Sequence, residues 1–326
     1  DGTLFAVPFD PVRLELRGSP LPVLEHLASE SNLGSAQVDA SATGTFVYRT
    51  RTNGTLAWID AAGATRRLPF EPGSYFAPIL SPDGATLAFA ARQAGKTVLF
   101  VRKLDQLQAA ALGGTEDAQY PFFSPDGQWI AFFAGGKLKK VSVTGGAPLN
   151  LCDAPSGRGG AWTDDDTIVF APASTPNTRL MRVSASGGAP SAAATFGEGG
   201  VTQRWPQALP GGKGLLYTEH SASTDFDAAN LVIAPLSGGT PKVVVRGGYY
   251  GRYVPSGHLL YMQQGTLFAA AFDLDRLETI GQAVPALEGV AADPSAGGAQ
   301  VAFSADGTLV YVTGAAAGTA HPIDWM

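Results

Sequence analysis

The stretch Gln119-Tyr-Pro-Phe-Phe-Ser-Pro-Asp-Gly-Gln-Trp-Ile-Ala-Phe-Phe133 holds two apolar runs separated by four turn-forming residues. Aromatic and branched side chains of the kind found in both runs favour β-strands. In the Ser-Pro-Asp-Gly sequence at 124–127, proline fixes φ, aspartate can bond its own backbone, and glycine tolerates a positive φ. The stretch therefore predicts a β-hairpin.

Turn sequences of the same kind recur along the whole chain. Their first residues are Ser41, Ser81, Ser124, Thr163, Leu209, Val254 and Ser304, at intervals of 39 to 50 residues. This spacing is typical of repeats that each form one sheet of about four short strands. The chain is therefore predicted to be an all-β protein with a β-propeller fold.

The beginning and the end of the chain are copies of one another. Gly2-Thr-Leu-Phe-Ala6 recurs as Gly265-Thr-Leu-Phe-Ala269, and Ala36-Gln-Val38 recurs as Ala299-Gln-Val301. Both pairs lie 263 positions apart (265 − 2 and 299 − 36). Residues 1–27 match 264–290 at 14 of 27 positions, and residues 34–48 match 297–311 at 10 of 15, which excludes coincidence.

Counting the expected strands favours seven four-stranded blades. Six complete sets of strands leave one half-set at each end of the chain, and residues 2–27 and 299–313 would share a seventh blade. Such a blade would join the termini and leave fewer exposed strand edges. The alternative is six blades plus extra strands, the surplus being a fragment of a neighbouring ring. In either case we expect a single β-propeller domain over residues 1–326.

The composition agrees with this fold and disfavours two classes of partner, nucleic acids and membranes. Charged residues make up 15% of the chain, while 41 glycines and 23 prolines suit many tight turns. A net charge of −6 disfavours nucleic acid as a partner, because such a surface needs a basic footprint. No apolar run approaches the ~18 residues of a membrane span, so no membrane insertion of this segment is expected.

Arginine and aromatic residues lead into the first strands of three consecutive blades. They are Arg158, then Arg204 with Trp205, then Tyr249 and Tyr250 with Arg252. In one interpretation they form a basic, aromatic-edged pocket at the mouth of the channel, because arginine offers forked donors to carboxylate or phosphate. In the other, each guanidinium stacks on a neighbouring blade or pairs with a carboxylate such as Glu198.

The residues four positions before each turn complete the set of expected channel residues. They are Gln37, Ala77, Tyr120, Gly159, Trp205, Tyr250 and Gln300. Two amides and no carboxylate stand at these positions, so the set lacks the cage of a bound cation, although Asp39 is close to one of them. The candidate ligand-binding residues are Arg158, Arg204, Trp205, Tyr250, Arg252, Tyr120, Gln37 and Gln300.

These expected channel residues are compatible with two functions of different classes. The favoured one is a non-enzymatic module that binds a peptide or a small anionic ligand at the channel mouth. The alternative is a metal-dependent hydrolase of the propeller lactonase or phosphotriesterase kind, which would need a central calcium ion. The four histidines stand far apart in the sequence and no Gly-x-Ser-x-Gly motif is present, so no metal ligand set and no catalytic residue is assigned and no cofactor is expected.

The Ser-Pro-Asp-Gly turns, preceded by Tyr-Pro-Phe-Phe and followed by Trp-Ile-Ala-Phe, resemble the TolB-like and WD-like β-propeller repeats of bacteria. The segment 115–127, Gly145-Gly-Ala-Pro148 and Arg204-Trp-Pro206 are similar to the propeller of bacterial receptor-type serine/threonine kinases. The kinase motifs themselves are absent from the chain. The resemblance implies a sensory or protein-interaction module, periplasmic or otherwise outside the cytoplasmic membrane in its parent protein, and it implies no catalytic residue.

Overall fold

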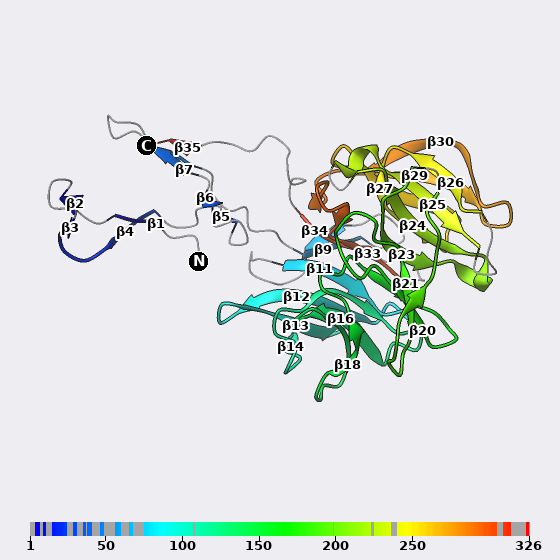
Figure 1. Ribbon diagram of the computed structural model, residues 1–326, viewed down its shortest axis with the longest axis horizontal. Helices are drawn as coiled ribbons and strands as arrows, with labels where there is room; N and C mark the ends of the chain where they lie inside the picture. The colour runs from blue at the N-terminus through cyan, green and yellow to red at the C-terminus, as the bar shows by residue number, and fades with distance from the viewer. Residues whose placement is uncertain are drawn as a thin grey trace. The chain divides into compact units, whose positions relative to one another are not determined.

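Figure 1 shows the computed structural model of the chain, in which nearly all regular elements of the described residues are β-strands. The structure describes residues 75–106, 108–197, 199–222, 225–235, 240–304 and 309–313, and before and after these only residues 15–24, 324–325 and the short strands 4–6, 9–10, 29–30, 35–36, 38–40, 46–48, 56–59 and 65–67. These residues belong to two compact units, Gly54–Gly318 on the one hand and Asp1–Asn53 with Thr319–Met326 on the other. The prediction of one domain over residues 1–326 stays a prediction.

In the larger unit the described residues form five antiparallel sheets of four consecutive strands each, which are the blades of the propeller. The blades are β11 (Tyr75–Leu80), β12 (Thr86–Gln93), β13 (Lys96–Lys103) and β14 (Ala110–Ala111); β15 (Gln119–Phe123), β16 (Trp129–Ala134), β17 (Lys137–Ser142) and β18 (Leu149–Asp153); β19 (Gly160–Trp162), β20 (Thr167–Phe170), β21 (Met181–Ser184) and β22 (Ser191–Ala192); β23 (Thr202–Ala208), β24 (Leu215–His220), β25 (Asn230–Ala234) and β26 (Lys242–Arg246); and β27 (Tyr249–Val254), β28 (His258–Gln263), β29 (Thr266–Asp273) and β30 (Glu278–Leu287). The all-β propeller fold predicted from the repeats is thus confirmed.

A further four-stranded sheet joins distant parts of the chain. It consists of β33 (Val301–Phe303), β34 (Leu309–Val312), β9 (Leu56–Ile59) and β10 (Thr65–Arg67), with β34 and β9 as its antiparallel central pair. In Figure 1 these strands connect the cyan and red ends of the larger unit. We call this the closing sheet.

The closing sheet corrects the blade count. The strand at 309–312 pairs with Leu56–Ile59 and not with residues 2–9, so the predicted seventh blade shared by residues 2–27 and 299–313 is wrong. The alternative of six blades plus extra strands does not match either, because the described residues form five blades of consecutive strands. The physical reason is the sequence duplication: residues 34–48 are a second copy of residues 297–311, so counting both the Ser41 and the Ser304 turn sequence overestimates the number of blades.

Packing between blades holds the larger unit together. The two faces of β16 contact different neighbours: Ala131 and Phe133 pack with Phe170 of the following blade, whereas Ile130 and Phe132 pack with Leu99 of the preceding one. Because successive strand side chains point to opposite faces, a strand that is apolar along its whole length fits between two sheets. The continuous run of apolar residues at 129–134 follows from this position.

The recurring turns have the geometry that their sequence predicts. In the turn at 124–127 the Gly127 N–H donates to the Ser124 carbonyl over 2.9 Å, and Gly127 has a φ of 69°. The Asp126 carboxylate accepts hydrogen bonds from the Ser124 hydroxyl and from the Gln128 N–H. The carboxylate is therefore occupied by its own turn, as expected for a structural residue.

The smaller unit contains hairpins built from short strands. In chain order the strands are β1 (Leu4–Ala6), β2 (Phe9–Asp10), β3 (Glu15–Leu16), β4 (Leu21–Leu24), β5 (Ser29–Glu30), β6 (Ser35–Ala36), β7 (Val38–Ala40), β8 (Phe46–Tyr48) and, from the other end of the chain, β35 (Asp324–Trp325). Their pairs are β1 with β4, β2 with β3, β5 with β6, and β8 with both β7 and β35. Of the helices in the described part, η1 (Pro210–Gly212) and η2 (Phe226–Ala228) are short 3-10 turns, and none is long and apolar enough to cross a membrane.

Candidate functional site

The first strands of four of the five blades share a backbone irregularity at the positions that the sequence marked as channel residues. Ala77, Tyr120, Trp205 and Tyr250 have positive φ values of 50°, 47°, 57° and 56°. In each case the pairing with the next strand shifts at this residue, which defines a β-bulge. A left-handed conformation costs a non-glycine residue about 1–2 kcal/mol. Strain of this kind clusters at functional sites, where the surrounding structure maintains it.

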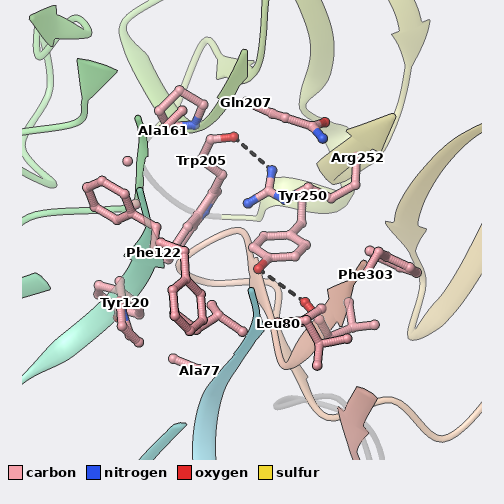
Figure 2. A pocket seen from close by; sticks show the side chains of 18 of the residues that line it. Ala77, Leu80, Tyr120, Phe122, Ala161, Trp205, Gln207, Tyr250, Arg252 and Phe303 are labelled. Carbon is pink, nitrogen blue, oxygen red and sulfur yellow. Dashed lines mark hydrogen bonds between the residues drawn. The ribbon is translucent and has the colours of Figure 1, made fainter. Parts of the chain in front are cut away.

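These strands surround a cavity of about 410 Å³. The lining comes from the first strands of all five blades and from the closing sheet: residues 77–80, 120–123, 159–162, 205–208, 250, 252–255 and 298–304, with Pro82 and Pro210. A cavity of this size, mostly apolar with a few polar groups, is typical of small-ligand sites. Figure 2 shows the side chains that converge on it.

Three aromatic rings form one wall of the cavity. The Trp205 ring centroid lies 4.9 Å from that of Tyr120 and 5.5 Å from that of Tyr250, both in edge-to-face contact. Glycines confine the indole, because a Cβ at Gly159 would lie 2.6 Å from Trp205 Cε3 and one at Gly298 would lie 2.8 Å from Cζ2. The indole is therefore closely confined between Gly159 and Gly298, with its ring in edge-to-face contact with two tyrosines.

Arg252 supplies the charge of the cavity. It is the one charged side chain among the lining residues that the structure describes. Its Nη1 donates to the carbonyls of Trp205 (3.0 Å) and Gly251 (2.8 Å), and the guanidinium lies 4.0 Å from the Tyr250 ring centroid (Figure 2). Its Nε and Nη2 donate to none of the described residues, and none of them forms an ion pair with it, so one edge of the guanidinium can receive an anion.

The amide side chains of the lining hold the strands in position. Gln207 bridges to Tyr253 of the next blade, donating through Nε2 to its carbonyl (3.0 Å) and accepting from its N–H (2.7 Å). The Gln300 Oε1 accepts from the Ala77 N–H and so connects the closing sheet to the first blade. The Tyr250 hydroxyl donates to the Val301 carbonyl over 3.4 Å (Figure 2).

The structure brings together five of the eight predicted ligand-binding residues. Tyr120, Trp205, Tyr250, Arg252 and Gln300 all line the cavity. Gln37 lies outside the described residues. Arg158 and Arg204 do not line the cavity, and their surroundings show what they contact instead.

Arg204 is buried and bonded to neutral acceptors. It is 2% exposed, and it donates through Nη1 to the Ala296 carbonyl (2.9 Å) and through Nη2 to the Ser174 carbonyl (3.0 Å). Its guanidinium lies 4.4 Å from the Phe226 ring centroid. Burial, and secondarily the positive charge of Arg158, lowers the pKa of Arg204 to about 10. Arg204 thus connects two loops, at Ser174 and at Ala296, by hydrogen bonds, which is a structural role and not that of a ligand-binding residue; we call this arrangement the clamp.

Arg158 contacts the aromatic wall at Tyr120. Its guanidinium lies 5.6 Å from the Tyr120 ring centroid, and Nη1 donates to the Gly157 carbonyl over 2.9 Å. The Nε is buried without a hydrogen-bond partner among the described residues. Burial raises the pKa of Tyr120, and the charge of Arg158 opposes that rise. Neither Arg158 nor Arg204 forms an ion pair with a described carboxylate.

Among the lining residues two positions after a bulge, sequence reasoning named Arg252 but missed the others. Ile79, Phe122 and Gln207 line the same cavity as the bulge residues that precede them, and so does Ala161, two positions after Gly159. Alternate strand residues face the same side, so the period of two was the signal that could have found them. Among the described residues no group of three or more His, Cys, Asp and Glu side chains forms a candidate metal site; the calcium of the alternative function stays untested.

Comparison with known proteins places the fold. No family model and no curated protein matches the sequence. Among solved structures, a protein assigned as TolB from Agrobacterium tumefaciens matches with a TM-score of 0.60 at 14% identity, over 81% of this chain and 98% of its own. TolB from Acinetobacter baumannii matches with 0.55 at 11% identity, over 81% of this chain and 66% of its own. An oligogalacturonate lyase in complex with manganese matches with a TM-score of 0.51 at 17% identity, over 79% of this chain and 75% of its own. At these identities the likeness shows the fold alone, a β-propeller of the TolB type.

Proposed function

We propose that this propeller is a non-enzymatic binding module that holds a small anionic ligand, such as the C-terminus of a peptide, in the cavity beside Arg252. The observation that supports the proposal is the charge of the lining. A single cation and no described carboxylate face a cavity of about 410 Å³ in a protein whose net charge is −6. A site of this charge, in an acidic protein, selects for an anion.

The contacts of Arg252 suit a carboxylate. Trp205 and Gly251 hold Nη1, which leaves the edge formed by Nε and Nη2 for a bidentate pair. Because the Tyr250 ring and two carbonyls already fix the guanidinium, little side-chain entropy is lost when a ligand binds. The aromatic wall offers apolar contact to the group next to the carboxylate, which for a peptide is its last side chain.

The test compares free acids with amides. We would titrate the protein by calorimetry with acetylated tripeptides that end in Leu or Phe, each made with a free C-terminal carboxylate and as the amide. The free acids are expected to bind and the amides to bind at least 10-fold more weakly, since a hydrogen bond to a charged group contributes roughly 1.5–3 kcal/mol. Equal binding of acids and amides, or no binding of either, would refute the proposal.

Two variants locate the site. Arg252→Gln removes the charge that faces the cavity and is expected to abolish the preference for the free acid. Arg246→Gln is the control, because Arg246 is exposed on β26 and does not line the cavity. If both variants weaken binding equally, the effect is one of net charge and not of this site.

We propose separately that the propeller lies outside the cytoplasmic membrane. The resemblance to receptor-kinase propellers supports a position outside the cytoplasmic membrane in a parent protein, where a sensory module meets its ligand. Protease treatment of intact cells that produce the parent protein tests this, because an extracytoplasmic propeller is cleaved after outer-membrane permeabilisation while a cytoplasmic marker survives. Protection of both would contradict it.

A further inference from the structure

Residues 1–48 do not merely resemble residues 264–311 in sequence; their strands pair in the same way. Leu4 pairs with Leu24 and Phe5 with Pro22, as Leu267 pairs with Leu287 and Phe268 with Pro285. The pair of β2 with β3 corresponds to a part of the pair of β29 with β30, and each residue lies 263 positions earlier. With the same offset, the pair of β5 with β6 corresponds to the pair of β31 (Ala292–Asp293) with β32 (Gly298–Ala299). The two segments are therefore two copies of one structural element.

The second hairpin of the element follows the same rule. In the pair of β7 with β8, Val38 is opposite Tyr48, and in the pair of β33 with β34, Val301 is opposite Tyr311. Strand β8 also pairs with β35, and in the other copy β34 pairs with β9 in the same way. Trp325 is opposite Val47 in the first pair, and Trp58 is opposite the equivalent Val310 in the second. Both copies thus offer the same strand edge to a strand from outside the copy.

The copy at 264–311 occupies one particular place in the larger unit. At its start β29 pairs with β28, and at its end β34 pairs with β9. The copy at 1–48 leads directly into β9 along the chain, since β8 ends at Tyr48 and β9 begins at Leu56. If it took that place, β7, β8, β9 and β10 would form a sheet of four consecutive strands, which is how the five blades are built.

We propose that the two copies compete within one molecule for this single place, so that the chain has two alternative ways of closing its propeller. In the arrangement of the structure, residues 264–311 lie between β28 and β9. In the alternative arrangement residues 1–48 lie there, and residues 264–311 are released. Each arrangement uses one full period of 263 residues, and the overlap of the two periods makes them mutually exclusive.

Three differences between the copies explain why the structure shows the first arrangement. Ala302 is 8% exposed and Val312 is 4% exposed, and both pack in the same apolar cluster. The N-terminal copy has Asp39 and Arg49 at these positions. Burial of an unpaired charge is strongly unfavourable, so the N-terminal copy fits this cluster less well.

The third difference acts on the backbone. Ala271 lies in the middle of a sheet, opposite His258 of β28 and Ile280 of β30. The N-terminal copy has Pro8 at this position, and a proline in a central strand removes a hydrogen-bond donor from the ladder. Removing these three differences should make the copies nearly equal competitors.

Cross-strand cysteine pairs distinguish the two arrangements in the full-length chain, with Cys152→Ser removing the natural thiol. Leu260 is opposite Ala269 in the structure, and Ala6 is the equivalent of Ala269 in the other copy. Leu260→Cys with Ala269→Cys therefore reports the observed arrangement, and Leu260→Cys with Ala6→Cys reports the alternative. Leu260→Cys with Ser19→Cys is the control for chance encounters, because the equivalent of Ser19 is not opposite Leu260.

The prediction concerns the yield of intramolecular disulfide after mild oxidation, measured on non-reducing gels and by mass spectrometry. Adding Pro8→Ala, Asp39→Ala and Arg49→Val is expected to raise the yield of the 260–6 pair at least fivefold and to lower that of the 260–269 pair. Adding Ala302→Asp to the C-terminal copy is expected to act in the same direction.

Two results would overturn the proposal. One is a 260–6 yield that stays at the level of the 260–19 control in every background. The other is a 260–6 disulfide that forms only between molecules, as covalent dimers. The three changes at residues 8, 39 and 49 keep the test decisive even if Ala302→Asp unfolds the protein, because they leave residues 54–318 unaltered.

Discussion

Replacement of Arg204 by methionine separates a structural role from a ligand-binding role for this residue. Methionine keeps an unbranched side chain against Phe226 but cannot donate to the carbonyls of Ser174 and Ala296. The Ala296 carbonyl retains the hydrogen bond from Trp205 Nε1 (3.2 Å), whereas the Ser174 carbonyl and the buried Thr202 hydroxyl lose the donor that Arg204 provided. A buried acceptor left without a partner costs about 1–3 kcal/mol.

Opposing this loss, the variant no longer buries a guanidinium next to Arg158. The cost of that burial is reflected in the lowered pKa of Arg204, about 10. We expect the lost hydrogen bonds to outweigh it, with a net destabilisation of roughly 2 kcal/mol. For a unit of this size that corresponds to a fall in Tm of about 4–8 °C.

The assay is urea unfolding followed by far-UV circular dichroism, with Arg252→Met as the comparison. Arg204→Met should lower the unfolding midpoint and keep peptide binding, whereas Arg252→Met, which also loses hydrogen bonds to two carbonyls, should abolish peptide binding. An Arg204→Met protein as stable as the wild type that has lost binding would refute the clamp and restore the role that the sequence predicted for this arginine.

Three further predictions concern the turns and the aromatic wall. Asp126→Ala should lower the free energy of unfolding by about 1 kcal/mol, because the hydroxyl of Ser124 and the N–H of Gln128 lose their acceptor; chemical denaturation measures this, and a folded variant with unchanged stability but no ligand binding would contradict a purely structural role. The hydrogen bond from Ser124 lowers the pKa of Asp126 and that from Thr163 lowers the pKa of Asp165, so their stabilisation is complete above the ordinary aspartate pKa of about 3.9 and is lost as the pH falls through the lower folded values. Melting curves between pH 6 and pH 2 should therefore show a shallower acid decline for Asp126→Asn with Asp165→Asn than for the wild type, and parallel curves would argue against the shifts. Gly159→Ala should displace the Trp205 indole and weaken peptide binding at least 10-fold, because its Cβ would lie 2.6 Å from the ring; Gly145→Ala is the control, since Gly145 also has a positive φ (94°) but nothing lies within 4 Å of an added Cβ, and equal effects on binding would show that backbone strain alone is responsible.

Local chemistry explains why the fold class could be predicted from the sequence. The turn at 124–127 and the apolar run at 129–134 each determine their own conformation, and their recurrence along the chain indicates a propeller without knowledge of long-range contacts. The blade count could not be obtained in this way. The duplication shows that two segments fit one place, but which of them takes it depends on the burial of Ala302 and Val312 against Asp39 and Arg49, and burial is a property of the folded protein.

The candidate site was predicted in part for the same reason. Tyr120, Trp205 and Tyr250 stand at equivalent repeat positions, so their convergence on the cavity follows from the repeat itself. The arginines are not equivalent: Arg252 lies two positions after its bulge and faces the cavity, whereas Arg204 lies one position before its own and faces Phe226. A bulge of one residue changes the side to which the next side chain points, and the sequence does not reveal where the bulge begins.

A bromide soak of protein crystals tests, without knowledge of the natural ligand, whether an anion binds Arg252 inside the cavity. Anomalous diffraction above the bromine absorption edge should show a peak within hydrogen-bonding distance of Arg252 Nε and Nη2, beside the Tyr250 ring. Crystals of Arg252→Gln should lack that peak and keep those at the protein surface. Bromide peaks at surface cations with none in the cavity of the wild-type protein would contradict the claim.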